Sequence, residues 1–250
     1  MAIVNFNKKQ FEKEIGKLDE KIQEKIALFG TPIESISQEE LQLEIFPNRP
    51  DLLSYQGFLR SFKAFIGKTP GLKEYKIDTP KKDHYIIIDK SVEKVRPFTA
   101  CAIVKNIKFN DENIKNVIDL QEKLHSTVGR KRKRVAIGIY PLDKIKFPIT
   151  FKAIEPDKIK FIPLGMKDEL TGFQILQRHP TGREYSHLLA QKEKYPIFVD
   201  ANNQILSMPP IINSELTGKI ESSTKDIFVE CSGFDLNILK KCLNIVVTSL

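Results

Sequence analysis

The chain has 250 residues, 41% of them hydrophobic, and its 40 Lys and Arg residues outnumber 32 Asp and Glu residues to give a net charge of +8. This composition excludes a disordered chain, and no apolar run reaches the roughly 18 residues of a membrane span. The first twenty residues are charged and amphipathic, unlike a signal segment, so we expect a cytoplasmic protein whose positive charge favours polyanionic partners.

The first 66 residues predict helices around one strand. Apolar residues recur at helical spacing over residues 8–29, and Gly16 predicts a break into two helices. Residues 41–45 alternate like a half-buried strand. Residues 55–66 carry one apolar stripe, with Ser54 placed to cap the helix.

A turn, Asn-Arg-Pro-Asp at residues 48–51, separates this strand from its helix. Pro50 fixes its own φ and keeps the preceding residue extended. Residues 67–83 are rich in turn formers and charge, which predicts a boundary. We therefore predict a small N-terminal α/β module over residues 1–75 and a larger mixed domain over residues 84–250.

The larger domain has the alternating pattern of an α+β fold. Its helices are predicted at 111–128, at 169–178 and from the capping residue Asp235 onward, where an apolar stripe runs to Leu250. A stripe that continues to the last residue is typical of a fragment of a longer protein. Strands are predicted at 85–89, 97–109, 135–140, 147–153, 159–163, 195–200, 204–208 and 226–232, with an Asn-rich hairpin turn at 201–203.

Several catalytic motifs are missing from the sequence: a phosphate-binding Gly-x-x-x-x-Gly-Lys loop, His-Glu-x-x-His, Cys-x-x-Cys and Gly-x-Ser-x-Gly. We therefore expect no metal site and no ATP chemistry. The three cysteines are widely spaced in apolar sequence, which predicts buried thiols: Cys101, Cys231 and Cys242. The four histidines are scattered and are predicted to be surface or capping residues: His84, His125, His179 and His187.

A run of five cations follows Gly129 and contains Arg130, Arg132 and Arg134. Adjacent cations repel one another unless solvent or phosphate lies alongside. The run is either a solvated loop or a loop that contacts phosphates, and we favour the second interpretation.

Gln121 is a polar residue on the apolar stripe of the predicted helix 111–128. A buried amide must find hydrogen-bond partners. It either satisfies backbone groups or faces a wet pocket, and the sequence leaves both open.

Strand alternation over residues 226–232 places Glu230 and Ser232 on one face. Beside Ser207 and the loop 209–214, these groups could bind a phenol hydroxyl, which needs an acceptor for its proton and a donor to its oxygen. The alternative is a solvated outer face on a surface strand.

Three segments, in order, resemble the N-terminal half of the archaeal and eukaryotic phenylalanyl-tRNA synthetase beta subunit: the turn 48–51 with its helix, the loop 209–215 and the ending 243–248. The resemblance implies that residues 84–250 form an editing domain that hydrolyses tyrosine from mischarged tRNA(Phe). It also implies that aminoacylation belongs to a partner alpha subunit. No cofactor is then expected for this chain. ATP and magnesium are expected to be needed only by the whole synthetase.

The resemblance also implies roles for individual residues. Glu230 stands where archaeal relatives generally have Asp and Ser232 where they have Thr, while Ser207 and Asn213 match. Phe198 stands where Leu is usual, and its larger side chain is expected to change the width of the pocket. Substrate-binding residues are then Phe198, Ser207, Glu230 and Ser232, and Arg130, Arg132 and Arg134 contact the tRNA.

Gln121 and Asn213 are the expected catalytic groups. No residue resembles a nucleophile, so a positioned water, helped by the terminal ribose hydroxyl, is expected to attack the ester. The competing hypothesis is a non-catalytic module that binds RNA and assembles with the alpha subunit.

Overall fold

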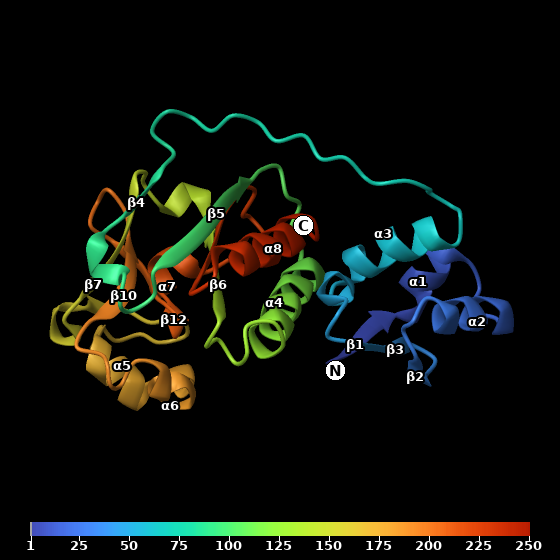
Figure 1. Cartoon of the computed structure of the whole chain (residues 1–250), viewed down its shortest axis with the longest axis horizontal. Helices are drawn as coiled ribbons and strands as arrows, with labels where there is room; N and C mark the ends of the chain where they lie inside the picture. Colours follow the sequence, from blue (N-terminus) through green and yellow to red (C-terminus); the bar gives the residue numbers. More distant parts are fainter. Residues whose placement is uncertain (1) are drawn as a thin grey trace.

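A three-stranded antiparallel sheet and three helices form the first part of the computed structural model, which describes residues 2–250 (Figure 1). Gly16, with φ of 114°, ends the first helix, and Asp19 caps the second, so the predicted break is confirmed. Ser54 accepts a hydrogen bond from Gly57 N and caps the third helix, as predicted. The elements are β1 (Ala2–Asn7), α1 (Lys8–Ile15), α2 (Glu20–Leu28), β2 (Ile33–Ile36), β3 (Glu40–Ile45), η1 (Pro50–Leu52) and α3 (Tyr55–Phe65).

Two further sheets and a short ribbon form the second part of the molecule. The first has the order β5 (Phe98–Val104), β13 (Ile227–Gly233), β6 (Val135–Pro141) and is antiparallel throughout. The second has the order β12 (Ile212–Asn213), β11 (Ile205–Met208), β10 (Tyr195–Val199), β7 (Ile149–Ile154), β4 (Ile86–Ile88), and only its β4–β7 pair is parallel among the described strands. A short ribbon joins β8 (Lys160–Phe161) to β9 (Leu170–Thr171).

Helices cover the outer sides of these two sheets, so the fold is α+β, as predicted. On the side of the first sheet lie α4 (Asp111–Ser126) and α8 (Leu236–Val247). On the side of the second lie α5 (Gly172–Arg178) and α6 (Pro180–Tyr185), and α7 (Glu215–Gly218) contacts β6 and β11. The remaining short turns are η2 (Lys90–Val92), η3 (Leu142–Lys144), η4 (Pro156–Lys158) and η5 (Ser186–Leu188).

Strand alternation decides which side chains enter the space between the two sheets. On β13, Val229 and Cys231 pack toward α8 in one apolar cluster. Phe228, from the opposite face, packs against β7 and β10 in another. Because Glu230 and Ser232 share the face of Phe228, they point between the sheets and not toward solvent.

The N-terminal part packs on α4 and α8 through one continuous apolar cluster. Ser54 Oγ lies 2.7 Å from Ser249 Oγ, and Arg60 donates a 2.7 Å hydrogen bond to Thr248 O. The segment 66–85 passes over this junction from α3 to β4 (Figure 1). The division of the chain at residues 75–84 remains a prediction, because the packed core continues across it.

Some sequence predictions need correction. Helix α8 ends at Val247, where the Thr248 hydroxyl donates to Asn244 O, although the apolar stripe continued to Leu250. His125 is neither a surface nor a capping residue: its ring is buried in α4, and its Nε2 accepts a hydrogen bond from Ile137 N. His179 is buried but is a capping residue, as predicted, because it lies between the end of α5 and the start of α6. The hairpin turn 201–203 is confirmed, and Asp200 Oδ1 accepts hydrogen bonds from Asn202 N in the turn and from Gln204 N just after it. No helix among residues 2–250 is long and apolar enough to cross a membrane.

Candidate functional site

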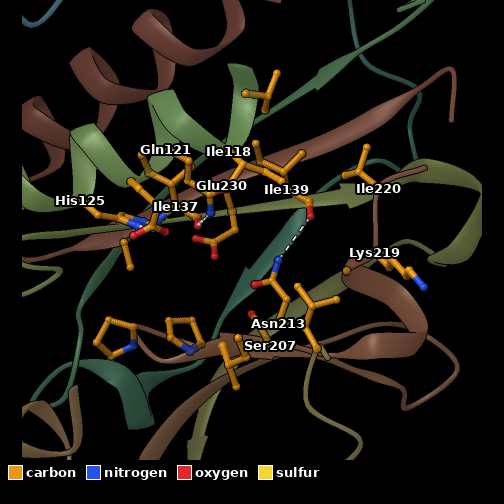
Figure 2. Close-up of a pocket in the computed structure, with 18 of the residues that line it drawn as sticks. Ile118, Gln121, His125, Ile137, Ile139, Ser207, Asn213, Lys219, Ile220 and Glu230 are labelled. Atoms are coloured by element: carbon orange, nitrogen blue, oxygen red, sulfur yellow. Dashed lines mark hydrogen bonds and ion pairs between the residues drawn. The ribbon is translucent and has the colours of Figure 1, made fainter. Parts of the chain in front are cut away.

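A cavity of about 280 Å³ lies at the open edge of β6. Figure 2 shows α4 and β6 along one wall and the segment containing Ser207 and Asn213 along the other. The Pro209–Pro210 peptide in that segment is cis. The polar residues of the lining include Gln121, Glu122, His125, Arg132, Ser207, Asn213, Lys219 and Glu230, and the apolar ones include Ile118, Ile137, Ile139, Ile211 and Ile220.

Glu230 is the carboxylate of this cavity and is only 2% exposed. Its Oε1 lies 3.3 Å from the Tyr140 hydroxyl, and its Oε2 has no hydrogen-bond partner among the described residues. Burial raises the pKa of Glu230 to about 8, so the group is mainly a neutral acid at pH 7. Gly138 lies directly opposite on β6, where a Cβ atom would come within 2.6 Å of Oε1.

Ser232 shares the face of Glu230, and a buried arginine donates a hydrogen bond to its hydroxyl oxygen. Arg96, 3% exposed, donates 3.0 and 2.5 Å hydrogen bonds to Ser232 Oγ and Ser232 O. Burial lowers the pKa of Arg96 to about 10, which still leaves it charged near neutrality beside Glu230. Ser232 is not part of the cavity lining.

Ser207 and Phe198 stand opposite each other on β11 and β10 but face different surroundings. Ser207 lines the cavity and its Oγ accepts a 2.7 Å hydrogen bond from the Tyr140 hydroxyl. The Phe198 ring is fully buried between the sheets and stacks on Phe151 with centroids 4.3 Å apart. The structure therefore brings Ser207 to Glu230 and leaves Phe198 outside the lining.

Gln121 and Asn213 approach the exposed edge of β6 from opposite sides. Gln121 Nε2 donates 2.7 Å to Ile137 O, and Asn213 Nδ2 donates 3.3 Å to Ile139 O (Figure 2). Each amide thus satisfies a backbone carbonyl and also lines the cavity. Gln121 therefore does both things that the sequence left open: it satisfies a backbone group and it faces a pocket.

His125 also lines the cavity, although no sequence motif assigned it to a site. Its Nε2 accepts a 2.8 Å hydrogen bond from Ile137 N, which places the ring proton on Nδ1, 3.2 Å from Glu122 Oε1. Burial lowers its pKa, in keeping with a neutral ring. The sequence did contain a signal for this role: His125 follows Gln121 by four residues, and this spacing puts both side chains on one face of the helix.

The three arginines of the basic run separate in the folded chain. Arg130 is exposed, and residues 130–132 all have positive φ, between 49° and 61°. Arg132 turns to the cavity, donating 2.8 Å hydrogen bonds to Glu122 Oε1 and Ile211 O. Arg134 lies 3.7 Å from the carboxylate of Asp235, at the start of α8.

The described residues provide no cluster of three His, Cys, Asp or Glu side chains that could hold a metal ion. The three thiols are unpaired, with Cys231 and Cys242 buried and Cys101 half-buried. The polar groups available in this cavity are the carboxyl groups of Glu230 and Glu122, the His125 ring, the Ser207 hydroxyl, the amides of Gln121 and Asn213, the basic side chains of Arg132 and Lys219, and main-chain groups.

Comparison with known proteins places the chain in a family. The B3/4 domain family matches residues 90–247. The phenylalanine–tRNA ligase beta subunits of Methanosphaera stadtmanae and Methanocaldococcus jannaschii are each 40% identical over the full chain, which spans 44% and 46% of their lengths. The chain therefore covers less than half of these curated relatives.

A solved structure agrees with this assignment. An N-terminal fragment of the phenylalanyl-tRNA synthetase beta subunit from Pyrococcus horikoshii superimposes with a TM-score of 0.91 at 36% identity, over 99% of this chain and 73% of that one. Sequence and fold thus agree over nearly every residue. The chain belongs to the phenylalanyl-tRNA synthetase beta-subunit family and corresponds to the N-terminal part of that subunit, including its B3/4 domain.

Proposed function

We propose that this chain is the editing part of a phenylalanine–tRNA ligase beta subunit and hydrolyses the ester of tyrosyl-tRNA(Phe). The observation that carries the proposal is the unpartnered Oε2 of Glu230, buried at the wall of a cavity that also contains Ser207. A buried polar atom without a partner favours a ligand that supplies one.

A phenol hydroxyl suits Glu230 because a neutral carboxylic acid can both donate and accept a hydrogen bond. Burial raises the Glu230 pKa to about 8 and so keeps the acid protonated near neutral pH. A phenylalanine ring in the same place would leave the carboxyl unsatisfied, at a cost of about 1–3 kcal/mol. Correctly charged tRNA would thereby be spared.

Hydrolysis is assigned to a bound water. Gln121 and Asn213 use their NH₂ groups on the edge of β6, which leaves their oxygens to orient that water toward the ester carbonyl. The terminal ribose hydroxyl assists as a proton carrier. Arg130, Arg132 and Arg134 are proposed tRNA contacts, and Arg130 is the most accessible of the three.

The remaining parts of the synthetase supply other steps. We propose an alpha subunit as partner, with ATP and magnesium needed only for the aminoacylation by the whole enzyme. This chain alone is expected not to charge tRNA.

A non-catalytic module that binds RNA and assembles with the alpha subunit is the second candidate. It is favoured by the burial of Phe198 and by the position of both Phe198 and Ser232 outside the cavity lining. In this version the cavity does not process an ester.

Deacylation of tyrosyl-tRNA(Phe) separates the two candidates. The wild-type chain should release tyrosine faster than buffer does, and Glu230→Ala should slow release about tenfold to a hundredfold with tRNA affinity nearly unchanged. Glu169→Ala is the matched control, because that carboxylate is exposed and outside the cavity. Wild-type release at the buffer rate would leave only the binding module.

A further inference from the structure

The outer edge of β6 offers backbone groups to the cavity. In an antiparallel pair, alternate residues bond to the partner strand and the others point away from it. Leu142 N donates a 2.9 Å hydrogen bond to Asp226 O, so the backbone N–H and C=O groups of the even-numbered residues in this segment point toward β13. The bond from Ile137 N to His125 confirms that the odd-numbered residues point outward.

Three of the four outward groups on Ile137 and Ile139 have side-chain partners. The Ile137 N–H bonds to His125, and the Ile137 and Ile139 carbonyls bond to Gln121 and Asn213. The fourth group, the Ile139 N–H, has no acceptor among the hydrogen bonds of residues 2–250. Ile139 is only 4% exposed and lines the cavity.

An unpaired N–H at this place is unusual, because leaving a buried backbone donor unsatisfied costs about 1–3 kcal/mol. The other outward groups of Ile137 and Ile139 are paired by α4 and by Asn213. An oxygen atom in the cavity, from a ligand or from a water that the ligand displaces, would complete this edge. Its position is defined by its neighbours, since it lies between the two carbonyls that Gln121 and Asn213 hold.

We propose that the Ile139 N–H is the oxyanion donor of the site and binds the acyl oxygen of the aminoacyl ester. The inference rests on the proposed editing function and names a group for one of its steps. The flanking amides hold the attacking water, so water and acyl oxygen are presented to each other along one strand edge.

Hydrolysis then begins with attack of the bound water on the ester. The water oxygen bonds to the ester carbon, and the carbonyl electron pair moves onto the oxygen held by Ile139 N–H. Collapse of this intermediate breaks the bond to the ribose oxygen, which takes a proton originating from the water. Tyrosine leaves as a carboxylic acid that ionises in solvent, and the tRNA regains its terminal hydroxyl.

The Ile139 amide can be observed directly. Isotope-labelled protein is titrated with 3′-deoxy-3′-(L-tyrosylamino)adenosine, an amide that cannot be hydrolysed as an ester. We expect the Ile139 amide proton to shift downfield and to exchange more slowly with solvent. A titration in which signals of Glu230 and Ser207 move but that of Ile139 does not would overturn the inference.

Removing the donor tests its role in the reaction. Ile139→Pro deletes an N–H that makes no bond to β13, and Pro141 already occupies the next outward position of the strand. The single-turnover deacylation rate should fall about a hundredfold or more, with tRNA affinity unchanged. The control is Ile88→Pro, at an outward position on the edge strand β4, away from the cavity.

A backbone ester at Ile139, with one at Ile88 as its control, replaces N–H by oxygen and covers the case in which Ile139→Pro does not fold. A folded Ile139 variant with the wild-type rate would overturn the oxyanion role while leaving editing intact. A wild-type chain that neither binds the probe nor deacylates tyrosyl-tRNA would overturn the proposed function, and the inference with it.

Discussion

The Tyr140 hydroxyl lies 2.7 Å from Ser207 Oγ and 3.3 Å from Glu230 Oε1, so one side chain of β6 links the two facing sheets at the cavity wall. Burial beside Glu230 raises the Tyr140 pKa well above its usual value, and the phenol stays protonated as a donor. The Tyr140 hydroxyl thus fixes the positions of Ser207 and Glu230 in the cavity wall.

Tyr140→Phe removes this link without changing the ring. It should lower the free energy of unfolding by about 1–3 kcal/mol, because the buried Ser207 Oγ loses its donor and Glu230 Oε1 loses the hydroxyl beside it. Urea unfolding measures the change. Tyr195→Phe is the control, since its buried ring has no hydroxyl bond to either residue. Equal stability of wild type and Tyr140→Phe would contradict the assigned contacts.

Glu230→Gln should change how stability depends on pH. The Glu230 pKa is raised from 4.5 in the unfolded chain to about 8 in the folded one. Its stabilising contribution is complete below pH 4.5 and is lost as the pH rises through about 8, because the unfolded state ionises first. The slope is about 1.4 kcal/mol per pH unit within this window.

Unfolding free energies of wild type and Glu230→Gln at several pH values between 5 and about 7.5 check this sign. The difference between the two proteins should move steadily in favour of the Gln variant as the pH rises. A constant difference would mean that Glu230 is ionised throughout, with Arg96 as its countercharge.

Arg130 and Arg132 should respond differently to substitution. Arg130→Ala removes an exposed cation and should flatten the salt dependence of tRNA binding by about one unit of slope, with the melting temperature unchanged. Arg132→Ala should instead cost about 1–3 kcal/mol of stability, because the side chain is only 11% exposed and holds Glu122 and Ile211 O. Equal salt slopes in wild type and Arg130→Ala would identify a merely solvated loop.

Phe198→Leu tests whether this residue sets the width of the pocket. The variant should lose about 1–3 kcal/mol through the lost stacking on Phe151 and the smaller volume, with little change in the preference for tyrosyl over phenylalanyl esters. Phe151→Leu, which breaks the same ring pair, should behave alike. A large change in ester preference for Phe198→Leu alone would place its ring at the substrate.

The sequence was most informative where a local pattern decides the outcome. Alternation on residues 226–232 correctly placed Glu230 and Ser232 on one face, and helical spacing located α4 with Gln121 on its buried side. The surroundings of that face could not be predicted. They depend on Arg96 and Tyr140, which are distant in sequence and arrive only when the two sheets pack.

Other features escaped prediction because their signals were short or ambiguous. The strand β12 has only two residues, and its pairing with Ser207 is what places Asn213 at the cavity. The basic run suggested one surface, but three successive left-handed residues send its arginines in different directions. Charge density describes composition, whereas the direction of each side chain depends on the backbone turn.

The apolar cluster shared by the N-terminal sheet, α4 and α8 limits how this cavity can be transplanted. The helix that carries Gln121 and His125 rests on side chains from before residue 67, so grafting only the lining residues onto another scaffold would leave that helix without support. When segments are exchanged with a homologue, the two sides of the interface that contains the Ser54–Ser249 contact should therefore be transferred together. A chimera whose two parts come from unrelated proteins would leave the apolar surfaces of this interface exposed. We expect such a chimera to aggregate before the cavity could be assayed.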